Sequence, residues 1–282
     1  MRQQRELERQ RRENRIRKKR RRTIITLIIL FILIIAVAAE CVILFRMTDI
    51  DSRFTRAVQR GVHEGWALNS NELQLYNTGT ITDTSFIEQE YAAISEYRNH
   101  RYKDDELGTL ANEYIAAITA CRKAAHRNDP KKDFNAFWSE FSEPYGRRLQ
   151  VLYKLENGDF DMDLANEQYT EEYVYMIAQG WLLDKIEELE FIQTETEGGI
   201  RFDTSIRNDT GYDIEYINLD IELSDPDGKV VENVSAYARD IDSDGMINLN
   251  FLCTANKAVK YRVTGEVCKL GKYRGDTEVS EQ

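Results

Sequence analysis

The chain has 282 residues and a formal net charge of −11, which is long enough for two modest domains. The charge is unevenly divided: residues 1–22 carry 12 Arg and Lys against 3 Glu, about +9, which leaves about −20 for the remainder. Four cysteines are present, and the three that follow residue 45 cannot all pair with one another, which excludes a disulfide framework.

The N-terminal residues 1–22 (MRQQRELERQRRENRIRKKRRR) form a basic tail with no apolar residues at helical spacing. An arginine-rich arm can bind RNA or DNA. Basic residues beside a membrane segment can instead fix topology and lie on anionic lipid headgroups, each gaining about 1 kcal/mol. Because the cluster abuts an apolar run, we favour a cytoplasmic tail on anionic headgroups and expect no nucleic-acid partner.

Residues 23–45 (TIITLIILFILIIAVAAECVILF) are apolar except for Glu40. A helix of this length spans about 34 Å, enough for a hydrocarbon core of about 30 Å. The sequence therefore predicts one transmembrane signal-anchor helix in the lipid bilayer. The positive-inside rule predicts a single-pass cell-membrane protein with a cytoplasmic N-terminus and an extracytoplasmic C-terminal portion.

Two alternatives remain for this run. The small residues Ala36, Ala38 and Ala39 could form a signal-peptide cleavage site, although the run exceeds the usual apolar region of about 7–15 residues. Glu40 could contact a partner helix within the membrane, or it could extend its carboxylate to the nearby interface.

Residues 50–192 show helical periodicity and predict an antiparallel bundle of four or five amphipathic helices. Asp104–Glu106 and Arg122–Arg127 mark the two ends of the clearest helix, as the helix dipole favours. Pro144 is expected to break or kink the next helix. The expected inward residues include Phe54, Val58, Val62, Trp66, Ile87, Tyr91, Ile94, Tyr97, Leu107, Leu110, Tyr114, Ile118, Phe137, Phe141, Tyr169, Tyr173, Met176, Leu183 and Ile186.

The aromatic richness of this bundle could indicate a ligand site, but aromatic residues at helical spacing more often form a core. The three histidines, at positions 63, 100 and 126, lie too far apart in sequence for a His-x-x-x-His metal motif. We therefore interpret the aromatic residues as core and predict no cofactor.

Beyond Glu197-Gly198-Gly199 the apolar period changes from 3.6 to 2. Residues 198–271 contain several alternating runs separated by turn clusters, which predicts a C-terminal immunoglobulin-like antiparallel β-sandwich. Residues 272–282 are expected to form a disordered tail. The predicted fold class is α+β multidomain, with one transmembrane helix, an extracytoplasmic antiparallel helical bundle and this sandwich.

The stretch Leu219–Val231 (LDIELSDPDGKVV) resembles the FxLYD domain, a small immunoglobulin-like family of bacterial envelope proteins. Leu223 and Asp225 match the signature, whereas Ile221 stands in the Phe position and Ser224 replaces the Tyr. The order of tail, anchor, bundle and sandwich is similar to uncharacterised surface proteins of Gram-positive bacteria. The resemblance implies a fold and a location but no catalytic residues.

One acidic stretch resembles the first half of a calcium loop. Asp240, Asp242 and Asp244 occupy positions 1, 3 and 5, and Gly245 occupies position 6. Phe251 stands where a bidentate Glu is required, and no helical pattern flanks the loop. We interpret the stretch as a turn between strands and keep calcium binding as an alternative.

No catalytic motif is present: the sequence lacks a phosphate-cradling Gly loop, a Ser nucleophile elbow and a Cys or Ser beside a His. We therefore predict a non-enzymatic, membrane-anchored cell-surface protein with a binding or structural function, whose partner is an unknown extracytoplasmic protein or wall ligand. One alternative is a membrane-tethered regulatory subunit that contacts a membrane complex through the transmembrane helix and basic tail. Another is a calcium-gated adhesin, which depends on the acidic loop alone.

Overall fold

The computed structural model describes residues 31–33, 35, 37, 50–68, 80–255 and 260–270, with side chains up to residue 263. The chain divides into two compact units, 1–51 with 101–103, and 52–100 with 104–282. In the first unit the backbone N–H of Lys103 donates to the Asp51 carboxylate at 3.0 Å. The second unit contains both the helical bundle and the β-sheets, so the described fold is α+β.

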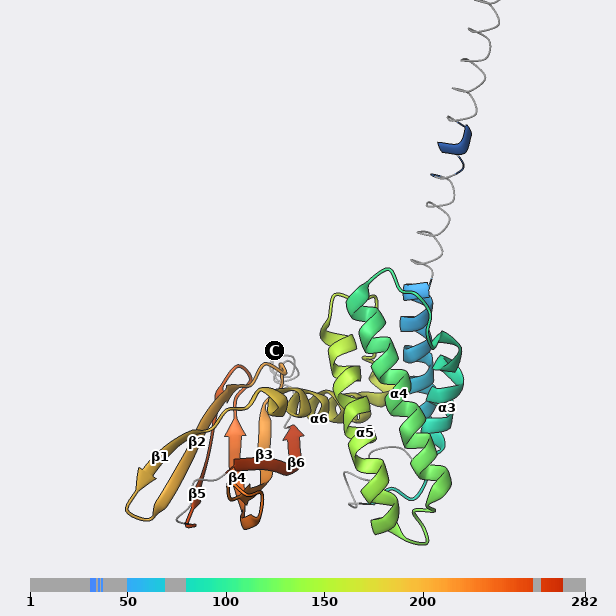
Figure 1. Ribbon diagram of the computed structural model, residues 1–282. Coiled ribbons are helices and arrows are strands. Elements are labelled where there is room, and N and C mark those ends of the chain that lie inside the picture. Colours follow the sequence, from blue (N-terminus) through green and yellow to red (C-terminus); the bar gives the residue numbers. More distant parts are fainter. Residues whose placement is uncertain are drawn as a thin grey trace, which may run out of the picture. The chain divides into compact units, whose positions relative to one another are not determined.

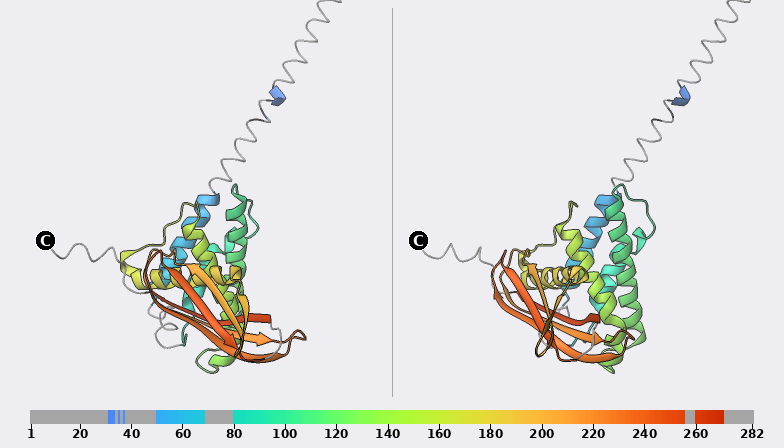
Figure 2. Two further views of the ribbon diagram at one scale, coloured as in Figure 1. Left: turned by 90° about the vertical axis from the view of Figure 1, so that its left-hand side faces the viewer. Right: turned by 60° about the vertical axis from the view of Figure 1, so that its left-hand side comes forward.

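The helical part is an antiparallel bundle in which α4 and α5 lie side by side (Figures 1 and 2). Its elements are a helix over 50–66, α3 (Ser85–Ile94), η1 (Ser95–Tyr97), α4 (Asp105–Arg127), α5 (Phe134–Asn157), η2 (Glu167–Tyr169) and α6 (Thr170–Glu188). The predicted stripe Phe54, Val58, Val62 and Trp66 is buried, which confirms the inward face of the first helix.

Local capping sets the ends of α4 where the sequence predicts them. The Asp104 carboxylate accepts hydrogen bonds from the backbone N–H groups of Glu106 and Leu107, both at 2.9 Å. At the other end, His126 and Arg127 occupy the last turn, and Asn128 follows as the C-cap.

Helix α5 differs from the prediction because it runs unbroken through Pro144. Proline removes one helical hydrogen bond and usually breaks a helix. Here Phe137 and Phe141 are buried before it, and Tyr145 and Leu149 are buried after it. Burial on both sides of Pro144 outweighs the local preference and keeps the helix continuous.

Helix α6 packs closely on α5 because position 180 is glycine. A Cβ atom at Gly180 would lie 2.5 Å from the Leu149 carbonyl oxygen and 2.6 Å from the Tyr153 Cβ. Every residue of α6 from Tyr175 to Leu182 is buried, so this stretch of the helix is covered on all sides. Helix α6 ends at Glu188, inside the range 50–192 predicted to be helical.

The C-terminal part forms two three-stranded antiparallel sheets, ordered β1-β2-β5 and β4-β3-β6. The strands are β1 (Ile192–Thr196), β2 (Gly199–Arg207), β3 (Ile214–Ser224), β4 (Val230–Ile241), β5 (Met246–Cys253) and β6 (Lys260–Leu270). The two inner faces share one apolar core, to which Phe202 and Leu249 contribute from the first sheet and Leu219 and Ile221 from the second. This arrangement is a β-sandwich.

Strand β1 was not predicted, because its sequence IQTET has no apolar alternation. All five of its residues are exposed, and it pairs with β2 alone. Because neither face of β1 is buried in the core, its sequence does not need to alternate between apolar and polar residues.

Helix α6 joins the bundle to the sandwich through a common core. Its residues Trp181 and Leu182 belong to the same apolar cluster as the inner faces of both sheets. The Trp181 indole N–H donates to the Asp209 carboxylate, and Lys185 pairs with the same carboxylate at 3.1 Å. Helix α6 therefore packs against α5 and also contributes to the core of the sandwich.

The predicted fold class is wrong in one respect, because it included a transmembrane helix. In the part of the chain that the structure describes, no helix combines the length and apolar character needed to cross a bilayer. The long helices α4 and α5, for example, carry charged side chains along their exposed faces. The same finding contradicts two further predictions, namely a single-pass, signal-anchored protein and a cell-membrane localisation.

Several predictions concern residues that the structure does not describe. Of the predicted span 23–45, the structure describes only 31–33, 35 and 37, which are helical. The basic tail 1–22, Glu40 and the tail 272–282 lie outside the described residues. The regulatory-subunit alternative depends on these segments.

Candidate binding surface

The acidic stretch 240–245 forms the connection between β4 and β5. Asp240, near the end of β4, has a φ of 53°, and Asp244 has a φ of 64°. The Asp244 carboxylate accepts a hydrogen bond from Arg207 at 3.3 Å. Among the residues that the structure describes, no three His, Cys, Asp or Glu side chains are grouped to hold a metal ion. The structure thus does not assemble Asp240, Asp242 and Asp244 as a ligand set.

Asn208 holds this turn in place from the end of β2. Its side-chain amide donates to the backbone oxygens of Tyr212 at 2.8 Å and Asp242 at 3.0 Å. Its backbone N–H donates to Gly245 and its backbone oxygen accepts from Asp244, both at 2.9 Å. The Asn208 side chain is fully buried, so these contacts are structural.

A second polar cluster lies inside the helical bundle. Both Glu90, on α3, and Arg148, on α5, are almost completely buried. The Arg148 guanidinium donates from Nε to the Glu90 carboxylate at 2.8 Å and also from Nη2. The Tyr114 hydroxyl, on α4, donates to the same carboxylate at 2.6 Å. Sequence analysis missed this cluster, because in the sequence its members are only polar residues next to apolar stripes.

This interior cluster ties three helices together but is closed to a substrate. Cys121 lies close enough for the charges of Glu90 and Arg148 to act on its thiol, yet burial dominates and raises the pKa of Cys121 to about 12. A thiol with so high a pKa is a poor nucleophile. The cluster is therefore best explained as a device that fixes how the helices pack.

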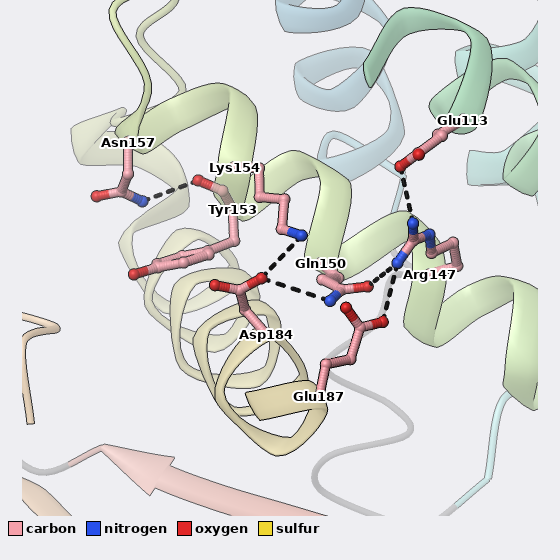
Figure 3. A network of polar contacts seen from close by, with 8 residues as sticks. All are labelled: Glu113, Arg147, Gln150, Tyr153, Lys154, Asn157, Asp184 and Glu187. Carbon is pink, nitrogen blue, oxygen red and sulfur yellow. Dashed lines mark hydrogen bonds and ion pairs between the residues drawn. The ribbon is translucent and has the colours of Figure 1, made fainter. Parts of the chain in front are cut away.

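A third network covers the seam between α4, α5 and α6 (Figure 3). Arg147 bridges Glu113 on α4 at 2.9 Å and Glu187 on α6 at 3.0 Å. Two turns further along α5, Lys154 pairs with Asp184 at 2.9 Å. These carboxylates face cations rather than an open site, so we interpret the network as orienting the helices.

The outer face of sheet β4-β3-β6 carries a different kind of cluster. The strand register places Tyr216 opposite Arg239 and Asn218 opposite Tyr237. The Tyr216 and Tyr237 ring centroids lie 6.2 Å apart, with planes 30° from parallel. Among the Phe, Trp and Tyr side chains described between residues 52 and 263, Tyr237 alone is exposed rather than buried or half-buried, with 46% of its surface accessible.

Arg239 orients the exposed ring of Tyr237. Its Nε and Nη2 groups donate to the Tyr237 hydroxyl at 3.2 and 3.1 Å, and the centre of its guanidinium lies 5.4 Å from the ring centroid. A guanidinium near an aromatic ring is attracted by the ring quadrupole. The pair holds Tyr237 in one orientation on the surface.

Small polar side chains continue this surface along β3 and β4. The Asp220 carboxylate accepts hydrogen bonds from Asn218 Nδ2 at 3.2 Å and Ser235 Oγ at 2.9 Å. We call the set of residues 216, 218, 220, 235, 237 and 239 the tyrosine face. Sequence analysis missed it because its members lie on two strands, and only the β3–β4 register brings them together.

The outer face of sheet β1-β2-β5 has another composition. It presents the exposed side chains of Arg201, Met246 and Leu252, and Arg201 is paired with Asp203 at 2.8 Å. The apolar side chains there stand singly among charged or amide neighbours, which is ordinary for a protein surface. A substitution on this face can therefore serve as the control for a substitution on the tyrosine face.

Comparison with known proteins leaves the family open. No family model matches the chain, and no curated protein matches it. A solved structure of the Pseudomonas fluorescens alkylpurine DNA glycosylase AlkC, bound to DNA containing an abasic site analog, aligns over 80% of this chain and 96% of its own. The identity is 11% and the TM-score is 0.14. The resemblance to the FxLYD domain stays a prediction.

Proposed function

We propose that the protein is a non-enzymatic binding protein and that the tyrosine face is its recognition surface. The observation that carries the proposal is the exposure of Tyr237 beside Tyr216 and Arg239 on an open sheet face. Tyr and Arg dominate the energetics of known recognition surfaces, because they combine a large contact area with directional hydrogen bonding. Ser and Asn, which also occur here, supply adaptable polar contacts.

The rest of the fold supports this proposal by making the surface rigid. Strand β3 is the central strand of its sheet, paired with β4 on one side and β6 on the other. Its inward residues Leu219 and Ile221 are buried in the core shared with α6. A recognition surface held on a rigid scaffold loses less conformational entropy on binding.

The proposal is tested by retention of ligands from an extract of the cells that make the protein. We expect immobilised wild-type protein to retain a component that Tyr216→Ala and Tyr237→Ala variants lose. Leu252→Ala, on the outer face of the other sheet, is the matched control and should retain it. Loss of the component with Leu252→Ala, or unchanged retention by both tyrosine variants, would show that the recognition surface lies elsewhere.

A further inference from the structure

We infer that the tyrosine face binds a neutral oligosaccharide chain. This inference rests on the proposed function and adds the chemical class of the ligand. It follows from three properties of the face: two nearly parallel aromatic rings, a row of hydroxyl and amide groups beside them, and ionic groups that are already engaged within the face.

The two rings supply an apolar surface of the kind that sugars recognise. The face of a pyranose ring carries C–H groups with partial positive charge, and the face of an aromatic ring is negative. The ring planes of Tyr216 and Tyr237 lie 30° from parallel, with centroids 6.2 Å apart, so the two rings form one aromatic patch that a sugar chain can contact. Because Arg239 holds the Tyr237 ring, little side-chain entropy is lost on binding.

The neighbouring polar groups suit sugar hydroxyls, which both donate and accept hydrogen bonds. Asn218 directly faces Tyr237 across the β3–β4 ladder, and Asp220 directly faces Ser235. Their amide, carboxylate and hydroxyl groups lie beside the rings on the same face of the sheet. Such a row offers donors and acceptors to equatorial hydroxyls without a deep pocket.

The charge balance favours a neutral ligand over an ionic one. Asp220 is engaged by Asn218 and Ser235, and the Arg239 guanidinium is engaged by the Tyr237 hydroxyl. Further along the same outer face, Arg262 pairs with Glu222 at 3.0 Å. Nucleic acid or another polyanion would require a cluster of cations facing it. Among the side chains that the structure describes on this face, the two arginines, Arg239 and Arg262, are accompanied by the carboxylates of Asp220 and Glu222.

The experiment measures binding of a panel of short neutral oligosaccharides to the full-length protein by calorimetry. We expect at least one to bind, and Tyr237→Leu to weaken that binding by about tenfold or more, equivalent to about 1.4 kcal/mol. Tyr237→Trp keeps an aromatic face and should retain most of the affinity. Leu252→Ala, on the other sheet, should leave the affinity unchanged.

Four outcomes would overturn the inference: no binding of any neutral oligosaccharide, equal affinity of Tyr237→Leu and wild type, weakened binding by Leu252→Ala, or binding confined to anionic glycans and abolished by salt. Retention of a protein, lost on Tyr237→Ala, together with no oligosaccharide binding would overturn the sugar inference and leave the proposed function standing. Near-UV circular dichroism of each variant verifies that the sandwich is folded.

Discussion

Replacement of Arg148 by methionine should destabilise the protein strongly, although it preserves most of the apolar volume. The side chains of Arg148 and Glu90 are 0% and 1% exposed, so the substitution leaves a buried carboxylate without its cation. Removing one partner of a buried ion pair costs about 3–5 kcal/mol. The hydrogen bond from Tyr114 to Glu90 remains, and it offsets a part of this cost.

The double variant Glu90→Leu/Arg148→Met separates the charge effect from packing. Because it removes both charges, it should lower the free energy of unfolding by less than either single substitution. The difference from additivity should therefore exceed the cost of either single substitution, at about 3 kcal/mol or more. Urea unfolding followed by tryptophan fluorescence gives these free energies. Arg127→Met is the matched control, since Arg127 forms an exposed pair with Glu140 that is worth at most about 1 kcal/mol.

Equal losses of unfolding free energy in Arg148→Met and Arg127→Met would contradict the conclusion that Arg148 and Glu90 form a buried ion pair. Additive costs in the double variant would also refute it, because two residues that share one hydrogen-bonded pair must be coupled.

Three further predictions concern packing, pH and reactivity. Gly180→Ala should lower the free energy of unfolding, measured by urea unfolding, by about 1–3 kcal/mol, since its Cβ would meet the Leu149 carbonyl oxygen at 2.5 Å. Gly146→Ala is the control and should be tolerated in the same assay, since the nearest neighbour of its Cβ would be 3.5 Å away. Burial raises the pKa of the Glu156 carboxyl above 4.5, so the folded state binds its proton more tightly than the unfolded state. The free energy of unfolding should therefore fall as pH rises from 4.5 through the raised pKa, and Glu156→Gln should flatten this fall, as urea titrations at several pH values will measure. The Cys121 thiol, with its pKa of about 12, should resist iodoacetamide in mildly alkaline buffer until the bundle unfolds. Mass spectrometry of the peptide that contains Cys121 measures the labelling. Modification of Cys121 in the native protein would contradict the prediction.

Elements with local signals could be predicted from the sequence. The ends of α4 follow from Asp104 and Asn128, because capping acts within one turn. The inward residues of β3 and β5 follow from strict alternation, since each strand has one face on the core.

Features that depend on distant partners could not be predicted. The continuity of α5 through Pro144 depends on burial against other helices, and the exposed strand β1 is defined by its pairing with β2 rather than by its composition. The pairing of Glu90 with Arg148 depends on how α3 and α5 are placed. The tyrosine face required the register that sets Asn218 opposite Tyr237, which periodicity within a single strand does not specify.

The location of the recognition surface is the central claim, and hydrogen–deuterium exchange tests it most directly. Backbone exchange of the full-length protein is compared with and without the tightest-binding oligosaccharide of the panel. We predict slower exchange in β3 and β4, with the helical bundle and the β1–β2 hairpin unchanged. Slower exchange in the bundle or in that hairpin, with β3 and β4 unaffected, would contradict the account.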